Sequence, residues 1–264
     1  MPAPAFNAME QKLSLDQDKI NAVWSRHWQA LENSKIKDLL ENPLFTEGYK
    51  VVKNLIRSGA KTILDAGGGS GRYAIKFAQD NPGAKIILAD IVPDSFGFVQ
   101  KLAVEFGVKN LEIKREDILN FNFPADSFDV VFCDAVIQHL PDWEKAVSEL
   151  SRVVKPGGVL VISVVNFWNL HSLFKAFMGK RYEYGFEKSF TKKELRRLMM
   201  DNNLSVLAEE GFYPAYGILR LKKYHRIFKF IGRAMNYCVK RLDRVSDRFF
   251  SKNFGFQILI AGKK

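Results

Sequence analysis

The residues best placed to do chemistry form a glycine-rich run preceded by an acid, Asp65-Ala66-Gly67-Gly68-Gly69-Ser70-Gly71. A short apolar run comes before it and an amphipathic, helix-like segment follows it. Glycines let the backbone turn tightly and let a ligand approach with no Cβ in the way. Free N–H groups at the start of the following helix favour a carboxylate or a phosphate. A strand–turn–helix of this kind disfavours a turn without function and predicts a ligand-binding loop.

The spacing of the glycines discriminates between ligands. A dinucleotide-binding fingerprint has the form G-x-G-x-x-G. Counted from Gly67, its last position falls on Arg72, whereas the glycines here recur at 67, 69 and 71. This spacing argues against a nicotinamide-dependent dehydrogenase.

Acidic residues follow the next two apolar runs. Asp90 ends the second run, where a carboxylate can accept both hydroxyls of a ribose. Glu116-Asp117-Ile118 follows the third run and places an acid within reach of an adenine amino group. Asp90 could instead cap a helix and Asp117 could form a turn, but their order and spacing together favour a nucleoside ligand.

These residues need a sheet to bring them together, and the hydrophobic pattern supplies one. Short apolar runs alternate with amphipathic helices, which is typical of strands buried on both faces of a parallel sheet. The predicted strands are 62–66, 85–90, 111–114, 129–134, 159–165, 204–210 and 256–261. The predicted helices between them are 72–79, 94–106, 143–154 and 191–202, the last with a capping box of Thr191 and Glu194. Lys155-Pro156-Gly157-Gly158 is expected to form a turn. The fold class is therefore doubly wound α/β.

Together these motifs resemble the class I S-adenosylmethionine-dependent methyltransferases that act on small molecules and lipids. The resemblance covers about residues 45–211 and the last strand, and it depends on five segments: 65–71, Asp90, 116–118, 127–142 and 153–163. It implies a Rossmann-like sheet of seven strands with the last strand antiparallel. The third consecutive glycine, Gly68, and the long basic segment after Pro214 depart from the family's pattern.

The resemblance also implies which residues bind S-adenosyl-L-methionine. The backbone of the glycine loop and the end of the fourth strand would border the methionine part, at Gly67, Gly69, Gly71, Asp134 and Ala135. Asp65 would orient the cofactor's amino group. Asp90 would hold the ribose with Ile91 against the adenine, and Asp117 and Ile118 would contact the ring.

Methyl transfer from a sulfonium mainly requires an acceptor atom held close and in line, and a general base helps weakly acidic acceptors. His139 is the candidate base, although a structural role for it stays open. Four residues after the fourth and fifth strands are candidates for the acceptor pocket: Trp168, His171, Tyr184 and Glu187.

Cys-Asp-Ala-Val at 133–136 lacks the Asn/Asp-Pro-Pro-aromatic pattern of enzymes that methylate nucleic-acid amino groups. No metal site is expected, because no His/Asp cluster has suitable spacing.

The charge of the chain is concentrated near its end. The net charge is +11, and the segment Ala215–Asn253 carries eleven basic and two acidic residues, a net +9. At 100° per residue its apolar side chains fall in one sector, opposite the basic ones. That sector contains Leu221, Tyr224, Phe228, Ile231, Met235, Val239, Leu242 and Phe249, and Gly232 is expected to bend or split the helix. Three roles stay open for this segment. In order of preference, it packs on the domain, contacts an anionic membrane surface through 220–250, or binds nucleic acid.

The sequence thus divides into an N-terminal helical lid (1–58), a cofactor-binding core (59–214), a basic amphipathic helical insertion (215–253) and a final core strand (254–264). In the lid, Trp24 and Trp28 could cover the site or simply pack. The composition, with 47% hydrophobic residues and two cysteines, excludes wholesale disorder and a disulfide framework. With no transmembrane run and no secretory signal, the expected location is cytoplasmic, with membrane association as an option. The oligomeric state is not predicted.

The function predicted is an S-adenosylmethionine-dependent methyltransferase acting on a small-molecule or lipid-like acceptor at oxygen or carbon. One alternative is an RNA methyltransferase that docks through the basic insertion. Another is a protein that binds S-adenosylmethionine without turnover, because no base is unambiguous.

Overall fold

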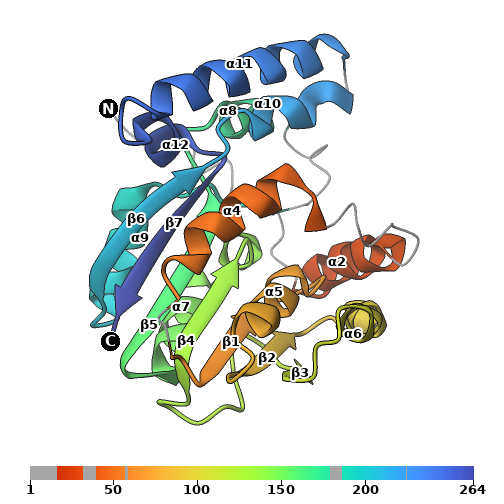
Figure 1. Cartoon of the computed structure of the whole chain (residues 1–264), viewed down its shortest axis with the longest axis vertical. Coiled ribbons are helices and arrows are strands. Elements are labelled where there is room, and N and C mark those ends of the chain that lie inside the picture. The colour runs from red at the N-terminus through yellow and green to blue at the C-terminus, as the bar shows by residue number, and fades with distance from the viewer. Residues whose placement is uncertain (1–16, 32–39, 57–58, 179–185, 224) are drawn as a thin grey trace.

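The computed structural model describes residues 17–31, 40–56, 59–178, 186–223 and 225–264, and a single seven-stranded sheet runs through them (Figure 1). The strands follow the order β3-β2-β1-β4-β5-β7-β6. Neighbouring strands are parallel except that β7 runs antiparallel to both β5 and β6. The predicted fold class and the antiparallel last strand are confirmed. The strands are β1 (Thr62–Ala66), β2 (Lys85–Asp90), β3 (Leu111–Arg115), β4 (Phe128–Asp134), β5 (Val154–Val165), β6 (Ser205–Phe212) and β7 (Gln257–Lys263).

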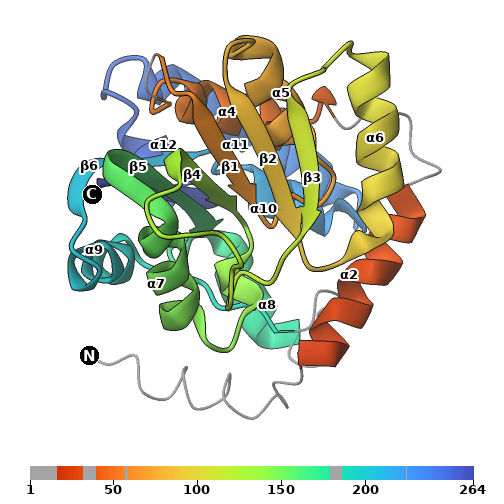
Figure 2. The same ribbon diagram turned by 90° about the horizontal axis from the view of Figure 1, so that it is seen from below.

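Helices cover both faces of this sheet (Figure 2). On one face, α7 and α9 pack against the strands, with Val147, Leu150 and Leu195 buried there. On the other face, α4 and α5 contribute Tyr49 and Phe77 to a separate core. The helices of these layers are α4 (Pro43–Lys53), α5 (Arg72–Asp80), α6 (Phe96–Glu105), α7 (Trp143–Val153) and α9 (Lys192–Asp201), whereas α2 (Gln17–Leu31) and α8 (Leu170–Met178) lie outside them.

Local signals in the sequence fix several helix ends. Asn42 caps α4 by accepting a hydrogen bond from the Leu44 N–H at 2.9 Å, and Pro43 follows in the first turn. Pro is well tolerated there because its missing N–H has no partner within the helix. Thr191 and Glu194 form the predicted capping box of α9.

The start of β5 differs from the prediction. The segment 155–158 was expected to be a turn, but β5 already begins at Val154, which pairs with Phe128. The register then shifts, so that Val130 pairs with Val159. Gly157 takes a positive φ of 78° and donates its N–H to the Lys264 carbonyl. The Pro-Gly-Gly sequence therefore forms an irregularity within a strand, held by the last residue of the chain.

The basic segment is not one long helix. It forms α10 (Tyr216–Arg220), the 3₁₀ turn η4 (Leu221–Lys223), α11 (Ile227–Asp243) and α12 (Phe249–Phe254). The helix is not split at Gly232, because α11 runs through it; a bend there stays a prediction. A Cβ there would lie 2.5 Å from Leu219, so Gly232 allows close packing on α10. No helix in the described part of the chain is long and apolar enough to cross a bilayer.

The carboxylate of Asp129 joins the starts of three strands. It accepts the N–H groups of Lys61 and Thr62 at 2.8 Å and the ammonium group of Lys155 at 2.9 Å. Burial would raise the pKa of Asp129, but these hydrogen bonds outweigh it and lower the pKa to about 2. The stabilisation is therefore complete above pH ~4 and is lost as the pH falls through ~2.

We predict that Asp129→Ala lowers the free energy of unfolding at neutral pH by ~1–3 kcal/mol, since it removes hydrogen bonds to a charged group. Urea denaturation measures the change, and the difference from the wild type should shrink below pH 3. Asp201→Ala, in an exposed pair on α9, is the control and should change stability little. An Asp129→Ala variant as stable as this control would contradict the assignment.

Candidate functional site

A pocket of 370 Å³ lies at the carboxyl ends of β1, β2 and β4. This is where open α/β sheets bind ligands, at the point where the strand order reverses, and the volume suits a small molecule. The predicted binding residues that line it are Asp65, Gly67, Gly69, Asp90, Ile91, Asp117, Ile118, Asp134 and Ala135. The fold thus brings nine of the ten predicted residues into one cavity.

The glycine loop approaches the cavity with bare backbone. The Gly67 N–H donates to the Ala89 carbonyl at 2.7 Å, which holds the loop against β2. Both Gly67 and Gly69 have positive φ, at 71° and 47°. A Cβ on Gly69 would lie 2.4 Å from the Trp28 ring. We call this stretch of bare backbone the glycine cradle; a side chain at Gly69 would have to displace the Trp28 ring.

Gly71, which was predicted to face the ligand, lies outside the pocket lining. It precedes α5 with a φ of 74°, and a Cβ there would lie 2.7 Å from Val99. Its place is the close contact between α5 and α6. Arg72, the next residue, does line the pocket.

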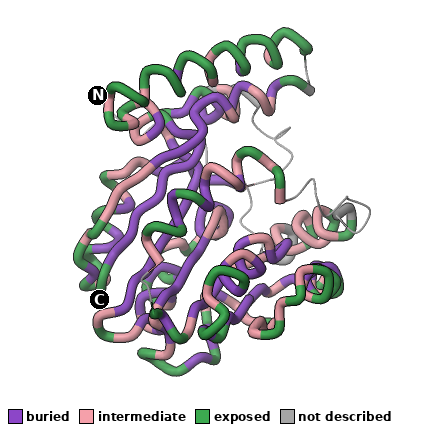
Figure 3. Tube along the Cα trace, viewed as in Figure 1, coloured by how far each residue is buried: buried purple, intermediate pink, exposed green. Residues whose placement is uncertain are grey.

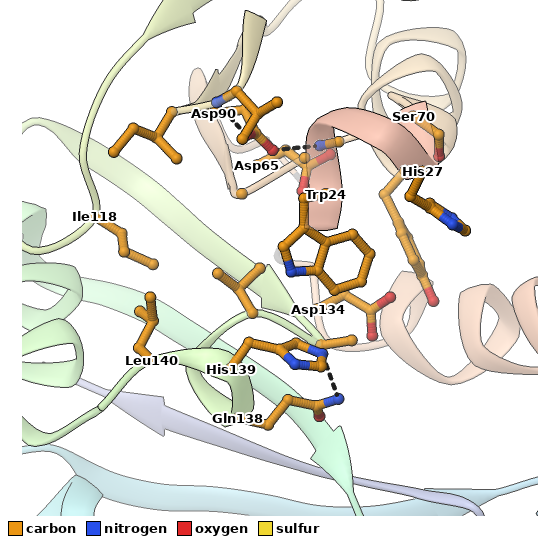
Figure 4. Close-up of a pocket in the computed structure, with 18 of the residues that line it drawn as sticks. Trp24, His27, Asp65, Ser70, Asp90, Ile118, Asp134, Gln138, His139 and Leu140 are labelled. Atoms are coloured by element: carbon orange, nitrogen blue, oxygen red, sulfur yellow. Dashed lines mark hydrogen bonds between the residues drawn. The ribbon is translucent and has the colours of Figure 1, made fainter. Parts of the chain in front are cut away.

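Asp90 is buried, and both of its carboxylate oxygens accept backbone hydrogen bonds (Figure 4). One accepts from the Gly69 N–H and the other from the Val92 N–H, each at 2.9 Å. Burial raises the pKa of Asp90, and these N–H groups oppose the rise. The carboxylate therefore ties the glycine loop to the end of β2. Its predicted bond to a ribose stays a prediction.

Two further carboxylates lie at or next to the ends of β1 and β4: Asp65 is buried, and the side chain of Asp134 is 7% exposed. Asp65 accepts the Ala74 N–H at 3.0 Å, and Asp134 accepts from Gln257 at 3.0 Å and pairs with Arg72 at 3.4 Å. Burial, reinforced by the charge of Asp134, raises the pKa of Asp65 to about 8. Burial also raises the pKa of Asp134, although Arg72 opposes this. A positively charged ligand next to such carboxyl groups favours their ionised form and would lower their pKa values.

His139 lies on the opposite wall in a buried polar network. Its Nδ1 is 2.8 Å from the Phe186 carbonyl oxygen, and because a carbonyl only accepts, we assign the proton to Nδ1. Its Nε2 then accepts from the Gln138 amide at 3.2 Å, and the same amide donates to Glu187 at 3.3 Å. Burial lowers the pKa of His139, and Glu187 offsets this only in part. His139 is a neutral imidazole at physiological pH, and its role as a base stays a prediction.

Helix α2 closes the pocket with aromatic side chains, as Figure 4 shows for Trp24 and His27. The Trp24 ring lies 4.9 Å from the His139 ring and stacks on Trp28 at 5.5 Å, between ring centroids. The sequence left open whether the two tryptophans cover the site or only pack. In the structure both line the pocket.

Two of the predicted acceptor residues lie elsewhere. Trp168 is 65% exposed and does not line the pocket. His171 is buried outside the lining, with its ring 5.3 Å from that of Phe256. Glu187 does line the pocket, and Tyr184 lies outside the described residues.

Sequence reasoning missed several lining residues near the chain's end. Tyr216 and Arg220 of α10 line the pocket together with Phe256 and Gln257. Tyr216 and Arg220 fall in the predicted insertion (215–253), and Phe256 and Gln257 fall in the predicted final strand (254–264). A basic residue at the end of a short helix, such as Arg220, carries no signal of which cavity it enters.

We predict that Gly69→Ala weakens S-adenosylmethionine binding about tenfold or more, because overpacking of this kind costs ~1–3 kcal/mol. The new methyl group needs the space that the Trp28 ring holds, at a backbone angle that favours glycine. Calorimetry gives the affinity, and circular dichroism checks the fold. Gly83→Ala, where a Cβ would meet nothing within 4 Å, should bind like the wild type. Equal affinity in both variants would refute the close approach.

The raised pKa of Asp65 predicts a pH-dependent stability. Between pH ~4 and ~8 the folded protein keeps a proton that the unfolded chain releases, so ligand-free stability falls as the pH rises. Asp65→Asn has no such proton. The free energy of unfolding of Asp65→Asn, relative to that of the wild type, should therefore rise by on the order of 1–3 kcal/mol from pH 5 to pH 8. Urea denaturation across this range is the measurement, with exposed Asp126→Asn as the control; a difference that does not vary with pH would contradict the prediction.

This chain is similar in sequence to known methyltransferases. A family model described as a methyltransferase domain matches residues 57–230. A demethylmenaquinone methyltransferase of Thermus thermophilus is 32% identical over 113 residues, which cover 43% of this chain and 51% of that protein. A ubiquinone biosynthesis O-methyltransferase of Paracidovorax citrulli is 29% identical over 198 residues, 71% of this chain and 80% of that one. The chain thus spans about half the length of the first of these relatives.

Solved structures show the same fold at low sequence identity. A methyltransferase of Thermotoga maritima, described as a possible histamine N-methyltransferase, has a TM-score of 0.63 at 16% identity, with 93% of this chain and 99% of that one covered. Phosphoethanolamine N-methyltransferase 2 of Haemonchus contortus, solved with S-adenosyl-L-methionine, has a TM-score of 0.59 at 19% identity, with 97% and 60% covered. With the matching family model and the strand order above, the chain belongs to the class I S-adenosylmethionine-dependent methyltransferases.

Proposed function

We propose that this protein transfers a methyl group from S-adenosylmethionine to an oxygen or carbon atom of a quinone-related aromatic small molecule. The observation that carries the methyl-transfer part is the glycine cradle beside three carboxylates in one pocket, two of them buried (Asp65 and Asp90) and one, Asp134, with a side chain 7% exposed. The names of the relatives, which include menaquinone and ubiquinone methyltransferases, support the choice of acceptor.

The residues of the pocket fit this cofactor. The bound cofactor supplies an activated methyl group on a positively charged sulfur. Asp65 and Asp134 lie next to the glycine cradle and would attract the positive charge of the methionine part. Asp90 and Asp117 would bind the polar groups of the nucleoside, with Ile118 against the ring. Side chains at Gly67 and Gly69 would collide with Val136 and Trp28, which themselves line the pocket, so the two glycines preserve its walls.

The remaining walls suit a flat acceptor with a polar edge. Trp24, Tyr216 and Phe256 offer aromatic surface, and Arg220 lies 5.7 Å from the centre of the Phe256 ring. Burial would raise the pKa of Glu187, but the nearby positive charges, Lys175 first and then Arg220, outweigh it and lower the pKa. Glu187 is therefore ionised, beside the Gln138 amide that also donates to His139. A phenol-like acceptor could lose its proton to this network as the bond to the methyl group forms.

The acceptor is tested by incubating the protein with S-adenosylmethionine and each member of a panel: catechol-type phenols, hydroquinones, RNA and phosphoethanolamine. We expect S-adenosylhomocysteine to form with the phenols or hydroquinones. Product formed only with RNA would instead support the RNA methyltransferase alternative. Tight cofactor binding without product from any acceptor would support binding without turnover.

We predict that Asp90→Ala weakens cofactor binding by ~1.5–3 kcal/mol, or about 10- to 150-fold, because it removes a charged hydrogen-bond acceptor. The loss includes the release of the glycine loop, whose Gly69 N–H then lacks its partner. Calorimetry with S-adenosylhomocysteine measures the effect without turnover. Glu116→Ala, on the same pocket but outside the assigned contacts, should weaken binding much less. Unchanged affinity in Asp90→Ala would refute the ribose assignment.

A further inference from the structure

Helix α11 has an apolar face that the pocket and the core do not use. Its inward side packs through Gly232 and Val239, which are buried, and through Met235 against the cluster of Val51 and Phe212. The other side of α11 is exposed along its length (Figure 3). Six apolar side chains on this other side, together called the outer stripe, are 45–86% exposed: Ile227, Phe230, Ile231, Tyr237, Leu242 and, just beyond the helix, Val245.

At 100° per residue the members of the outer stripe fall within a sector of about 140°, roughly opposite Gly232 and Val239. One charged side chain, that of the exposed Arg241, lies within the same sector as the outer stripe. This arrangement differs from the sequence-based expectation of a single apolar face. Ile231 and Leu242 belong to the outer stripe, whereas Val239 of the same predicted face is buried. Soluble proteins scatter single exposed apolar residues, but a stripe of them along one helix marks an interaction surface.

A basic edge borders the outer stripe. It consists of Arg226, Lys229, Arg233 and Arg244, which are exposed and have no carboxylate partner among the described residues. Lys240 continues this edge but pairs with Glu47 at 2.8 Å. The one acid within α11, Asp243, is turned inward, where it accepts the N–H groups of Phe250 and Ser251. The surface therefore combines positive charge with apolar side chains.

We propose that α11 docks on an anionic lipid bilayer, with the outer stripe among the acyl chains and the basic edge at the level of the lipid phosphates. A helix with Phe and Ile on one face and Lys and Arg beside it has the chemistry of an interfacial helix. Nucleic acid would satisfy the basic edge but would leave Phe230 and Ile227, 76% and 53% exposed, without a partner. Anionic lipid satisfies both parts of the surface.

The surface of α11 and the pocket lie on opposite sides of α10. Helix α10 contributes Tyr216 and Arg220 to the pocket and lies between the pocket and α11, with Leu219 against Gly232. Docking would hold the pocket close to the bilayer, which suits an acceptor dissolved in the membrane. The inference does not depend on that acceptor, since binding to vesicles is measured without it.

The test is flotation of the full chain with vesicles of phosphatidylglycerol and phosphatidylcholine, compared with phosphatidylcholine alone, at low and high salt. We expect binding to the anionic vesicles that salt weakens. The double variant Phe230→Ser with Ile227→Ser should bind about tenfold more weakly or worse, because it removes buried apolar area. Val104→Ser with Met200→Ser, which are 83% and 64% exposed elsewhere, should bind like the wild type.

The charge contribution is tested separately. Arg226→Glu with Arg233→Glu should weaken binding about tenfold or more, whereas Lys193→Glu with Arg197→Glu on α9 should reduce it much less. Both double variants at α11 should keep S-adenosylhomocysteine affinity, since neither site lines the pocket.

A probe reports the contact directly. Cys238 is exposed on α11 and Cys133 is buried, so an environment-sensitive fluorophore can be attached at Cys238. We expect its emission to shift to the blue on anionic vesicles. No binding to these vesicles, binding that the α11 variants leave unchanged, or a shift caused by RNA or by self-association without lipid would each overturn the proposal.

Discussion

The main constraint on the structure is the presence of three largely buried carboxyl groups at the carboxyl ends of neighbouring strands. Asp65, Asp90 and Asp134 lie at or next to the ends of β1, β2 and β4, which lie side by side, so that their side chains converge on one pocket. A buried carboxylate is costly unless hydrogen bonds or positive charge compensate it. Backbone N–H groups compensate Asp65 and Asp90 in part, and Arg72 with Gln257 does so for Asp134, but burial still raises the pKa of all three. The positively charged cofactor can add to this compensation, which couples its binding to the electrostatics of the sheet edge.

The glycine loop and the N-terminal helix share the same space. Gly69 leaves room that the Trp28 ring occupies, and Trp24 reaches across to His139. Residues 41 positions apart (Trp28 and Gly69) and 115 positions apart (Trp24 and His139) thus meet at the pocket. Because α2 packs on the loop through aromatic contacts, a change in either should alter both cofactor affinity and the cover of the site.

The C-terminal helices connect the pocket with the surface. Tyr216 and Arg220 on α10 belong to the pocket, and α11 rests on α10 through Gly232. Glycine at this position allows the two helices to approach closely, which a larger residue would prevent. The same layer that shapes the acceptor side of the pocket therefore carries the outer stripe on its far side.

The sequence by itself determined the strands, the capping box of α9 and the ligand loop, because each depends on residues close together in the chain. Periodicity gave β1 and β2 to the residue, and glycine spacing with Asp90 indicated the nucleoside. Only tertiary structure decided that Trp168 faces away from the pocket while Arg220 enters it. It also decided that α11 is apolar on two sides, since a helical wheel gives the angle of a side chain but not the element packed against it. Contacts between distant segments depend on how the layers assemble, and no local pattern encodes them.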